Sequence, residues 1–217
     1  MVLPAQQDRR TLVGTARALA AQDYPGGVDV VVVDLGGNRD VQRAVQALRE
    51  VSLVRLPVPD RRAALTAAVS GAGGDVVALL DSRCRPGAGW LRETVAVLRD
   101  VPGPCVVTGP VRVVPLEPAR PTRVERWAAT VRARTGDRGW YDVASNAVVR
   151  RADLDLADLD LAGADGRWPE ARDRARWSGL VRPGARVVRA PGAVLHRAAP
   201  WTPREALALL VRARRRT

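Results

Sequence analysis

The stretch that decides the fold is Val76-Val77-Ala78-Leu79-Leu80-Asp81. Its apolar run has the length of a strand, and a strand that is apolar on both sides is typical of a sheet buried on both faces. Val28 to Val33 has the same character, and Asp34 follows it as Asp81 follows the first stretch. Two buried strands that each end at an aspartate predict a layered α/β domain.

Segments with helical spacing alternate with these strands. Apolar residues recur at helical intervals in Asp40 to Arg49, and Arg61 to Ser70 ends at glycines. This alternation predicts a mostly parallel central sheet flanked by helices on both faces, with ligands beyond the carboxyl ends of the strands. The other expected strands are Val51–Leu56, Cys105–Val107, Val111–Val114, Val143–Val149, Val187–Val188 and Ala193–Leu195, and the other expected helices are Gly89–Arg99, Thr122–Arg134 and a basic helix over 201–217.

The composition argues against several classes of protein. The chain has 217 residues, a formal net charge of +12 and 35 basic residues, all of them arginine. No apolar run approaches the roughly 20 residues that span a bilayer, and we expect no secretory leader. Cys84 and Cys105 are too few for a disulfide framework, which favours a reducing cytoplasm. With 4% aromatic residues and no nucleic-acid motif, the charge indicates an arginine-rich surface, not a nucleic-acid partner.

Several short motifs follow one another along the chain. Each is weak alone, but their order and rough spacing hold over almost the whole sequence. They are Pro4-Ala5-Gln6-Gln7-Asp8 with Ala21-Gln22-Asp23-Tyr24-Pro25 and Val31-Val32-Val33-Asp34, then Gly74–Pro86 with Trp90-Leu91, then Ala144–Arg151, Gly163-Ala164-Asp165 and Arg189–His196.

Together these motifs resemble family 2 glycosyltransferases. That family carries P-A-x-N-E, A-Q-x-Y-P and V-V-V-D-D-G-S, then G-D-V-V-A-F-L-D-A-D-C-x-P and G-W-L, then G-x-N-x-A-x-R-R, G-F-D and a closing x-x-P-x-A-x-x-x-H. The resemblance implies the GT-A fold, a single domain over 1–217. On this basis we expect a nucleotide-binding half at 1–110, an acceptor-binding half at 111–200 and the basic helix at 201–217.

The resemblance implies an inverting transferase that moves a sugar from a UDP- or GDP-sugar to a hydroxyl acceptor. Asp173 matches the base that takes the acceptor proton, although a rival alignment on Glu170-Ala171 would lose that base. Asp81 and His196 match positions near a divalent Mg or Mn ion. The positions implied for the nucleotide-sugar are Pro4, Ala5, Asp34, Asp81, Arg83 and Asn146.

Two further features concern the acceptor. Trp140 and Tyr141 lie in a glycine-flanked segment and are candidates for stacking on a sugar or acceptor. The basic terminal helix would suit the anionic inner face of a membrane, and hence a lipid-linked acceptor, although its apolar residues could equally dock on the domain.

Several family positions are changed. Leu35 stands beside Asp34 in place of an acidic residue, Arg83 stands at the last position of D-x-D, and Arg172 replaces the Glu of the E-D pair. Arg83 puts a guanidinium where the metal would lie, which makes a divalent cofactor doubtful. Two hypotheses stay open: Arg83 binds the diphosphate directly, or the domain is a non-catalytic relative that binds nucleotide or a protein partner.

Each candidate residue also has a purely structural interpretation. Asp34 and Asp81 could cap helices that follow their strands, and Asp173 could pair with neighbouring arginines. Asn146 could satisfy turn backbone, and His196 could be a polar residue at a strand end.

Overall fold

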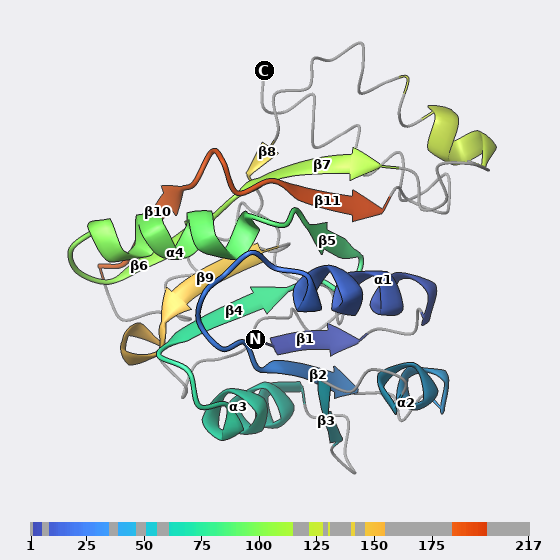
Figure 1. Ribbon diagram of the computed structural model, residues 1–217, viewed down its shortest axis with the longest axis horizontal. Helices are drawn as coiled ribbons and strands as arrows, with labels where there is room; N and C mark the ends of the chain where they lie inside the picture. Colours follow the sequence, from blue (N-terminus) through green and yellow to red (C-terminus); the bar gives the residue numbers. More distant parts are fainter. Residues whose placement is uncertain are drawn as a thin grey trace.

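In the computed structural model the chain folds into two sheets with helices packed against them (Figure 1). The structure describes residues 2–5, 9–34, 39–46, 51–55, 61–114, 122–127, 130, 140–141, 146–154 and 184–198. Among these residues the strands of the central sheet are β1 (Val2–Ala5), β2 (Val30–Asp34), β3 (Val51–Arg55), β4 (Val76–Leu80), β6 (Cys105–Thr108), β9 (Asn146–Arg150) and β10 (Arg186–Arg189).

The central sheet has the strand order β10-β6-β9-β4-β1-β2-β3. Within the described part, neighbouring strands are parallel except β9, which runs antiparallel to both β4 and β6. The expected mostly parallel sheet is therefore confirmed. The reversed strand places Asn146 opposite Leu80 and Arg150 opposite Val76. We call the edge that contains Asn146 and Leu80 the carboxyl edge, and the edge that contains Arg150 and Val76 the amino edge.

Helices cover both faces of the central sheet, as expected. The helices are α1 (Arg9–Ala20), α2 (Arg39–Gln46), α3 (Arg61–Gly71), α4 (Trp90–Asp100) and a short 3₁₀ helix (Arg151–Asp153). Val30 and Val32 of β2 share one core cluster with buried residues of α1, α2 and α4. The connection through α3 crosses the sheet in the opposite direction to those through α1 and α2, so right-handed crossovers put α3 on the other face, where it contacts β1, β2 and β3.

The second sheet consists of β5 (Cys84–Pro86), β11 (Leu195–Ala198), β7 (Pro110–Val114) and β8 (Trp140–Tyr141), in that order. β5 was not expected from the sequence. The chain passes from β6 to β7 at Gly109, where an added Cβ would lie 1.8 Å from the carbonyl oxygen of Ala193. Only glycine permits this close crossing of two backbone segments.

Several expected boundaries move. The described part of the strand expected at Val143–Val149 is β9, which continues to Arg150, and residues 143–145 lie outside the described residues; β11 starts at Leu195, the residue at which that strand was expected to end. The expected helix over Thr122–Arg134 is helical at 123–127 and at 130 among its described residues. The expected helix over 201–217 lies outside the described residues. No helix in the described part of the chain has the length and apolarity to cross a membrane.

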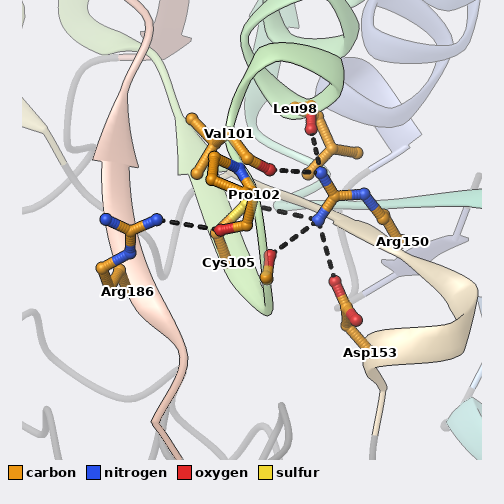
Figure 2. Close-up of polar contacts among 8 residues, drawn as sticks. Leu98, Val101, Pro102, Cys105, Arg150, Asp153 and Arg186 are labelled. Carbon is orange, nitrogen blue, oxygen red and sulfur yellow. Dashed lines mark hydrogen bonds and ion pairs between the residues drawn. The ribbon is translucent and has the colours of Figure 1, made fainter.

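Arg150, the last residue of β9, caps the carboxyl end of α4 (Figure 2). Its guanidinium donates to the carbonyl oxygens of Leu98 and Val101 at the end of that helix, and to Gly103 at 2.8 Å. It also lies 3.2 Å from a carboxylate oxygen of Asp153. The last carbonyls of a helix lack partners within the helix, so a cation placed there satisfies them and also opposes the helix dipole.

Arg151 does the same for α3. Its Nε donates to the carbonyl oxygen of Gly74 at 2.7 Å and its Nη1 to that of Val69 at 2.6 Å, while its Nη2 donates to Ala72. The two adjacent arginines, at the junction of β9 and the 3₁₀ helix, therefore attach helices from opposite faces of the sheet to its amino edge.

Candidate functional site

The carboxyl edge gathers most of the residues that the sequence singled out. Ala5, at the end of β1, is the register partner of Asp34 at the end of β2. Asp81 directly follows β4, and Asn146 lies opposite Leu80, the last residue of β4. Because β1 lies between β2 and β4, Pro4, Ala5, Asp34 and Asp81 occupy one continuous stretch of this edge. This is the edge at which ligands bind in open α/β sheets.

The two aspartates are buried, and Asp81 does not begin a helix. Relative exposure is 2% for Asp34 and 4% for Asp81. α2 begins at Arg39, and a turn followed by β5 comes after Asp81. The helix-capping interpretation is therefore wrong for Asp81, whereas for Asp34 it stays open because residues 35–38 lie outside the described residues.

Asp81 is held by arginine side chains. Arg83 donates from its backbone N–H to Oδ1 at 2.9 Å, from Nε to Oδ1 at 3.4 Å and from Nη2 to Oδ2 at 3.1 Å. Nη2 of Arg197 lies 3.5 Å from Oδ2. Burial alone would raise the pKa of Asp81, but the charges of Arg197 and Arg83 and the hydrogen bonds from Arg83 outweigh it and lower that pKa below its ordinary value. Asp81 is accordingly a carboxylate with both oxygens facing guanidinium groups.

Arg197 is the residue that the sequence analysis missed. It lies on β11 beside His196, and consecutive strand residues point to opposite faces, so the His196 side chain is on the other face of this sheet from Arg197. The signal was present in the sequence: the closing pattern P-x-A-x-x-x-H, counted from Pro191 and Ala193, reaches position 197. The residue that faces Asp81 is therefore the arginine, not the histidine.

His196 lies in a row of basic residues across the second sheet. Its register partners are Arg85 on β5 and Arg112 on β7. Burial, and then the charge of Arg112, lower the pKa of His196. The imidazole is therefore neutral near pH 7. Among the described contacts nothing joins it to Asp81.

Asn146 makes internal contacts that its sequence position did not reveal. It is fully buried. Its Oδ1 accepts hydrogen bonds from the Gly109 N–H at 2.9 Å and from Trp90 Nε1 at 3.4 Å, and its Nδ2 donates to the Gly109 carbonyl at 3.4 Å. These contacts favour the structural interpretation of Asn146, because they fix the crossing from β6 to β7 and the start of α4.

The A-Q-x-Y-P motif supports the segment that carries Asp81 and Arg83. Gln22 donates to the Gly87 carbonyl at 2.9 Å and accepts from the Leu91 N–H at 2.9 Å. From α1, the Thr15 hydroxyl donates to the Ser82 carbonyl at 2.8 Å. These buried and half-buried contacts tie α1 and its end to the segment that runs from Asp81 to α4.

The described residues at this edge do not fit a divalent metal. Such ions take several hard oxygen ligands, whereas Arg83 stands at the last D-x-D position and guanidinium nitrogens lie within 3.5 Å of Asp81 Oδ2. In the part of the chain that the structure describes, no three His, Cys, Asp or Glu side chains gather to hold a metal. A dication placed on Asp81 would also meet the repulsion of two fixed positive charges.

The remaining predicted site residues are only partly described. Trp140 and Tyr141 form β8, paired antiparallel with Val111 and Pro110 of β7. Asp173 lies outside the described residues, so its role as base stays a prediction.

Comparison with protein families gives one match: the model described as Glycosyl transferase family 2 matches residues 1–155. No curated protein sequence matches this chain significantly.

Among solved structures, S. aureus TarS 1–349 superposes with a TM-score of 0.60 at 16% identity, covering 98% of this chain and 64% of that one. The same protein in complex with UDP-GlcNAc gives 0.58 at 16% identity, covering 94% and 59%. Glucosyl-3-phosphoglycerate synthase from Mycobacterium tuberculosis, in complex with Mn²⁺, UDP and glucosyl-3-phosphoglycerate, gives 0.54 at 20% identity, covering 97% and 75%. The chain thus spans less than two thirds of the length of the TarS structure. At sequence identities of 16% to 20%, the similarity to these structures shows the fold alone.

Proposed function

The chain belongs to glycosyl transferase family 2, and from this premise we propose that it transfers a sugar from a nucleotide-sugar donor to a hydroxyl group of an acceptor. The observation that carries the proposal is the pair of buried carboxylates Asp34 and Asp81, which flank the end of β1 at the carboxyl edge. Buried charged groups at that edge are typical of a ligand site.

In the proposed reaction the acceptor oxygen forms a bond to the anomeric carbon from the face opposite the leaving group. The bond between that carbon and the diphosphate oxygen breaks, and its electron pair leaves with the nucleoside diphosphate. Asp173 takes the proton of the acceptor hydroxyl. A single displacement of this kind inverts the configuration of the sugar.

A UDP-sugar is the favoured donor. The solved relatives were crystallised with UDP-GlcNAc or with UDP, and in this chain Asp34 is the candidate for contact with the nucleoside. A GDP-sugar remains the second donor to test. The acceptor class that we propose is a lipid-linked hydroxyl at the inner face of the membrane, approached by the basic segment 201–217, with Trp140 and Tyr141 stacking on it.

One observation favours a second candidate function, a domain that binds nucleotide without turnover. Asp81 lies against Arg83 and Arg197, and the family's acidic partner of Asp173 is Arg172 in this chain. Arg83 and Arg172 thus stand where the family has acidic residues that it uses for transfer.

Binding and turnover separate the two candidates. Thermal-shift titration with UDP, GDP and their sugars identifies the nucleotide, because a ligand that binds only the folded chain raises its melting temperature. Release of UDP or GDP in the presence of membrane lipid extract then measures transfer. Saturable binding with turnover supports the transferase, whereas binding without turnover under every metal condition supports the non-catalytic domain.

Asp34→Asn tests the residue on which the proposal depends. Loss of a charged hydrogen-bond acceptor should weaken nucleotide binding by about 10-fold or more. Asp100→Asn, a change of the same charge at the exposed end of α4, is the matched control and should bind as the parent does. Equal affinities in the two variants would remove Asp34 from the site.

A further inference from the structure

Two guanidinium groups from separate parts of the chain meet on the Asp81 carboxylate. Nη2 of Arg83 is 3.1 Å from Oδ2 and its Nε is 3.4 Å from Oδ1. Nη2 of Arg197 is 3.5 Å from the same Oδ2. Two positive side chains thus lie against one negative side chain at the carboxyl edge.

Both arginines are held on well-connected backbone. The Cys84 N–H donates to the Asp81 carbonyl at 2.9 Å, which closes the turn that carries Arg83, and the Arg83 carbonyl accepts from the Ala198 N–H at 2.9 Å. Arg197 pairs with Cys84 within the second sheet. β11 therefore sets the position of both guanidinium groups at once.

The two arginine side chains are more exposed to solvent than the Asp81 carboxylate that they contact. The side chain of Arg83 is 32% exposed and that of Arg197 is 13% exposed, while Asp81 beneath them is 6% exposed. Charges withdrawn from water in this way act more strongly on a bound anion than charges on a fully exposed side chain. The arrangement presents cationic groups toward the surface with the carboxylate underneath.

We infer that Arg83 and Arg197 together bind the diphosphate of the donor, in the place that a divalent cation has in a metal-dependent transferase, and that Asp81 is a positioning residue that orients the two guanidinium groups. The inference rests on the proposed function, because it places the diphosphate at the same edge. It adds Arg197 to the site and a chemical role for Asp81.

Guanidinium chemistry fits this task. Arginine keeps its charge at every pH at which the protein is folded, and its planar fork of N–H donors matches two phosphate oxygens. As the sugar–oxygen bond breaks, the diphosphate takes the bonding electrons and gains negative charge. Two fixed cations stabilise that charge with no metal ion required.

The test uses inorganic pyrophosphate and UDP as probes, because pyrophosphate reports on the diphosphate site without the nucleoside. Calorimetric titrations are run with EDTA and again with Mn²⁺. We expect both probes to bind in EDTA, with affinities that Mn²⁺ changes by less than about 3-fold. Arg83→Gln and Arg197→Gln should each weaken pyrophosphate binding by about 10-fold or more. Arg99→Gln, which removes an exposed arginine in the last turn of α4, should leave it unchanged.

The outcomes separate this inference from the proposed function. Binding of both probes only when Mn²⁺ is present would overturn the inference but would not contradict the proposed transferase function. Arginine-dependent binding of pyrophosphate and UDP in EDTA, together with no turnover of any nucleotide-sugar, would support the contact between the arginines and the diphosphate and would contradict the transferase function. No binding of either probe in either condition would overturn both.

The role of Asp81 needs its own readout. With the fold checked by circular dichroism, Asp81→Asn should bind pyrophosphate about 10-fold more weakly than the parent, because the guanidinium groups lose the carboxylate that orients them, and the remaining binding should be the same with and without EDTA. Arg197→Lys, which keeps the charge but loses the fork, should bind with an affinity between those of the parent and Arg197→Gln. Complete loss of pyrophosphate binding in Asp81→Asn, with Mn²⁺-dependent binding in the parent, would make Asp81 a metal ligand instead.

Discussion

A pair of arginines lies at each of the two edges of the central sheet, and the pairs differ in their main polar partners. One pair donates mainly to carbonyl oxygens, with one further contact from Arg150 to Asp153, and the other pair contacts a buried carboxylate. At the amino edge Arg150 donates to main-chain carbonyl oxygens at the end of α4 (Figure 2), and Arg151 donates to those at the end of α3. At the carboxyl edge Arg83 and Arg197 lie against the carboxylate of Asp81. The first pair attaches helices to the sheet, and the second pair concentrates charge where ligands bind.

The difference shows why arginine content alone says little about function in this chain. All 35 basic residues are arginine, yet the role of each arginine depends on the group that accepts its hydrogen bonds. A carbonyl is neutral and does not titrate, so a guanidinium that caps a helix adds stability at any working pH. A carboxylate titrates and is buried at a cost, so the cluster at the carboxyl edge depends on pH and on both charges remaining in place.

The largest expected effect comes from Asp81→Asn. This change leaves two guanidinium groups close together without their counter-charge, and we expect the free energy of unfolding to fall by about 3 kcal/mol near neutral pH. The lowered pKa of Asp81 means that the folded state favours the ionised form. Its contribution is therefore complete above the ordinary value of 3.8 and is lost as the pH falls through the lower pKa of the folded chain.

Urea unfolding of the parent and the variant across the acid range measures this directly. The difference between their unfolding free energies should be constant above about pH 5 and shrink in acid. A difference that stays the same at every pH would show that ionisation of Asp81 contributes nothing to stability.

Arg150→Gln tests the other edge. Removing the donor to Leu98, Val101 and Gly103 leaves helix-end carbonyls with fewer partners, and we expect a loss of about 2 kcal/mol. Pyrophosphate binding by the folded variant should not change, because Arg150 lies at the edge away from the site. Arg99→Gln removes an exposed arginine near the same helix end and should cost little. Equal losses of stability in the two variants would contradict the capping role.

Arg151→Gln should cost less, about 1 kcal/mol, because Arg150 also pairs with the Asp153 carboxylate at 3.2 Å in addition to its hydrogen bonds to carbonyl oxygens. Hydrogen exchange measured by mass spectrometry locates the effect. Faster exchange should be confined to the last turn of α3 in this variant and to the last turn of α4 in Arg150→Gln. Exchange that rises in both helices in either variant would show that the two arginines act as one unit.

The sequence predicted the parts of the fold that local pattern decides. β4 has the bounds that its apolar run indicated, Val76–Leu80, because a short run rich in β-branched and apolar residues suits a strand that is buried on both faces of a sheet. β5 could not be predicted, since its three residues become a strand only by pairing with β11, more than a hundred residues away in the sequence.

The candidate site was likewise predictable only where local sequence pattern decides the position of a residue. Asp34 and Asp81 could be found because they follow buried strands, and parallel strands bring such positions to one edge. The contacts of Asn146 could not be found, because its partners Gly109 and Trp90 are distant in the sequence. Arg197 was missed because one step along a strand reverses the face, so assigning the motif to His196 put the wrong side chain toward Asp81.

The smallest expected effect, and the one that sharpens the contrast between the two faces of β11, comes from His196→Gln. Burial and the charge of Arg112 lower the pKa of His196 below 6.5, so the folded chain resists protonation more than the unfolded chain does. Below that value the unfolded state binds more protons, and the stability of the parent falls as the pH falls. The melting temperature of the variant should therefore decline less between about pH 7 and pH 5.5 than that of the parent. Because His196 points away from Asp81, affinity for pyrophosphate should stay at the parental level, and a loss of affinity comparable to that of Arg197→Gln would mean that both faces of the strand serve the site.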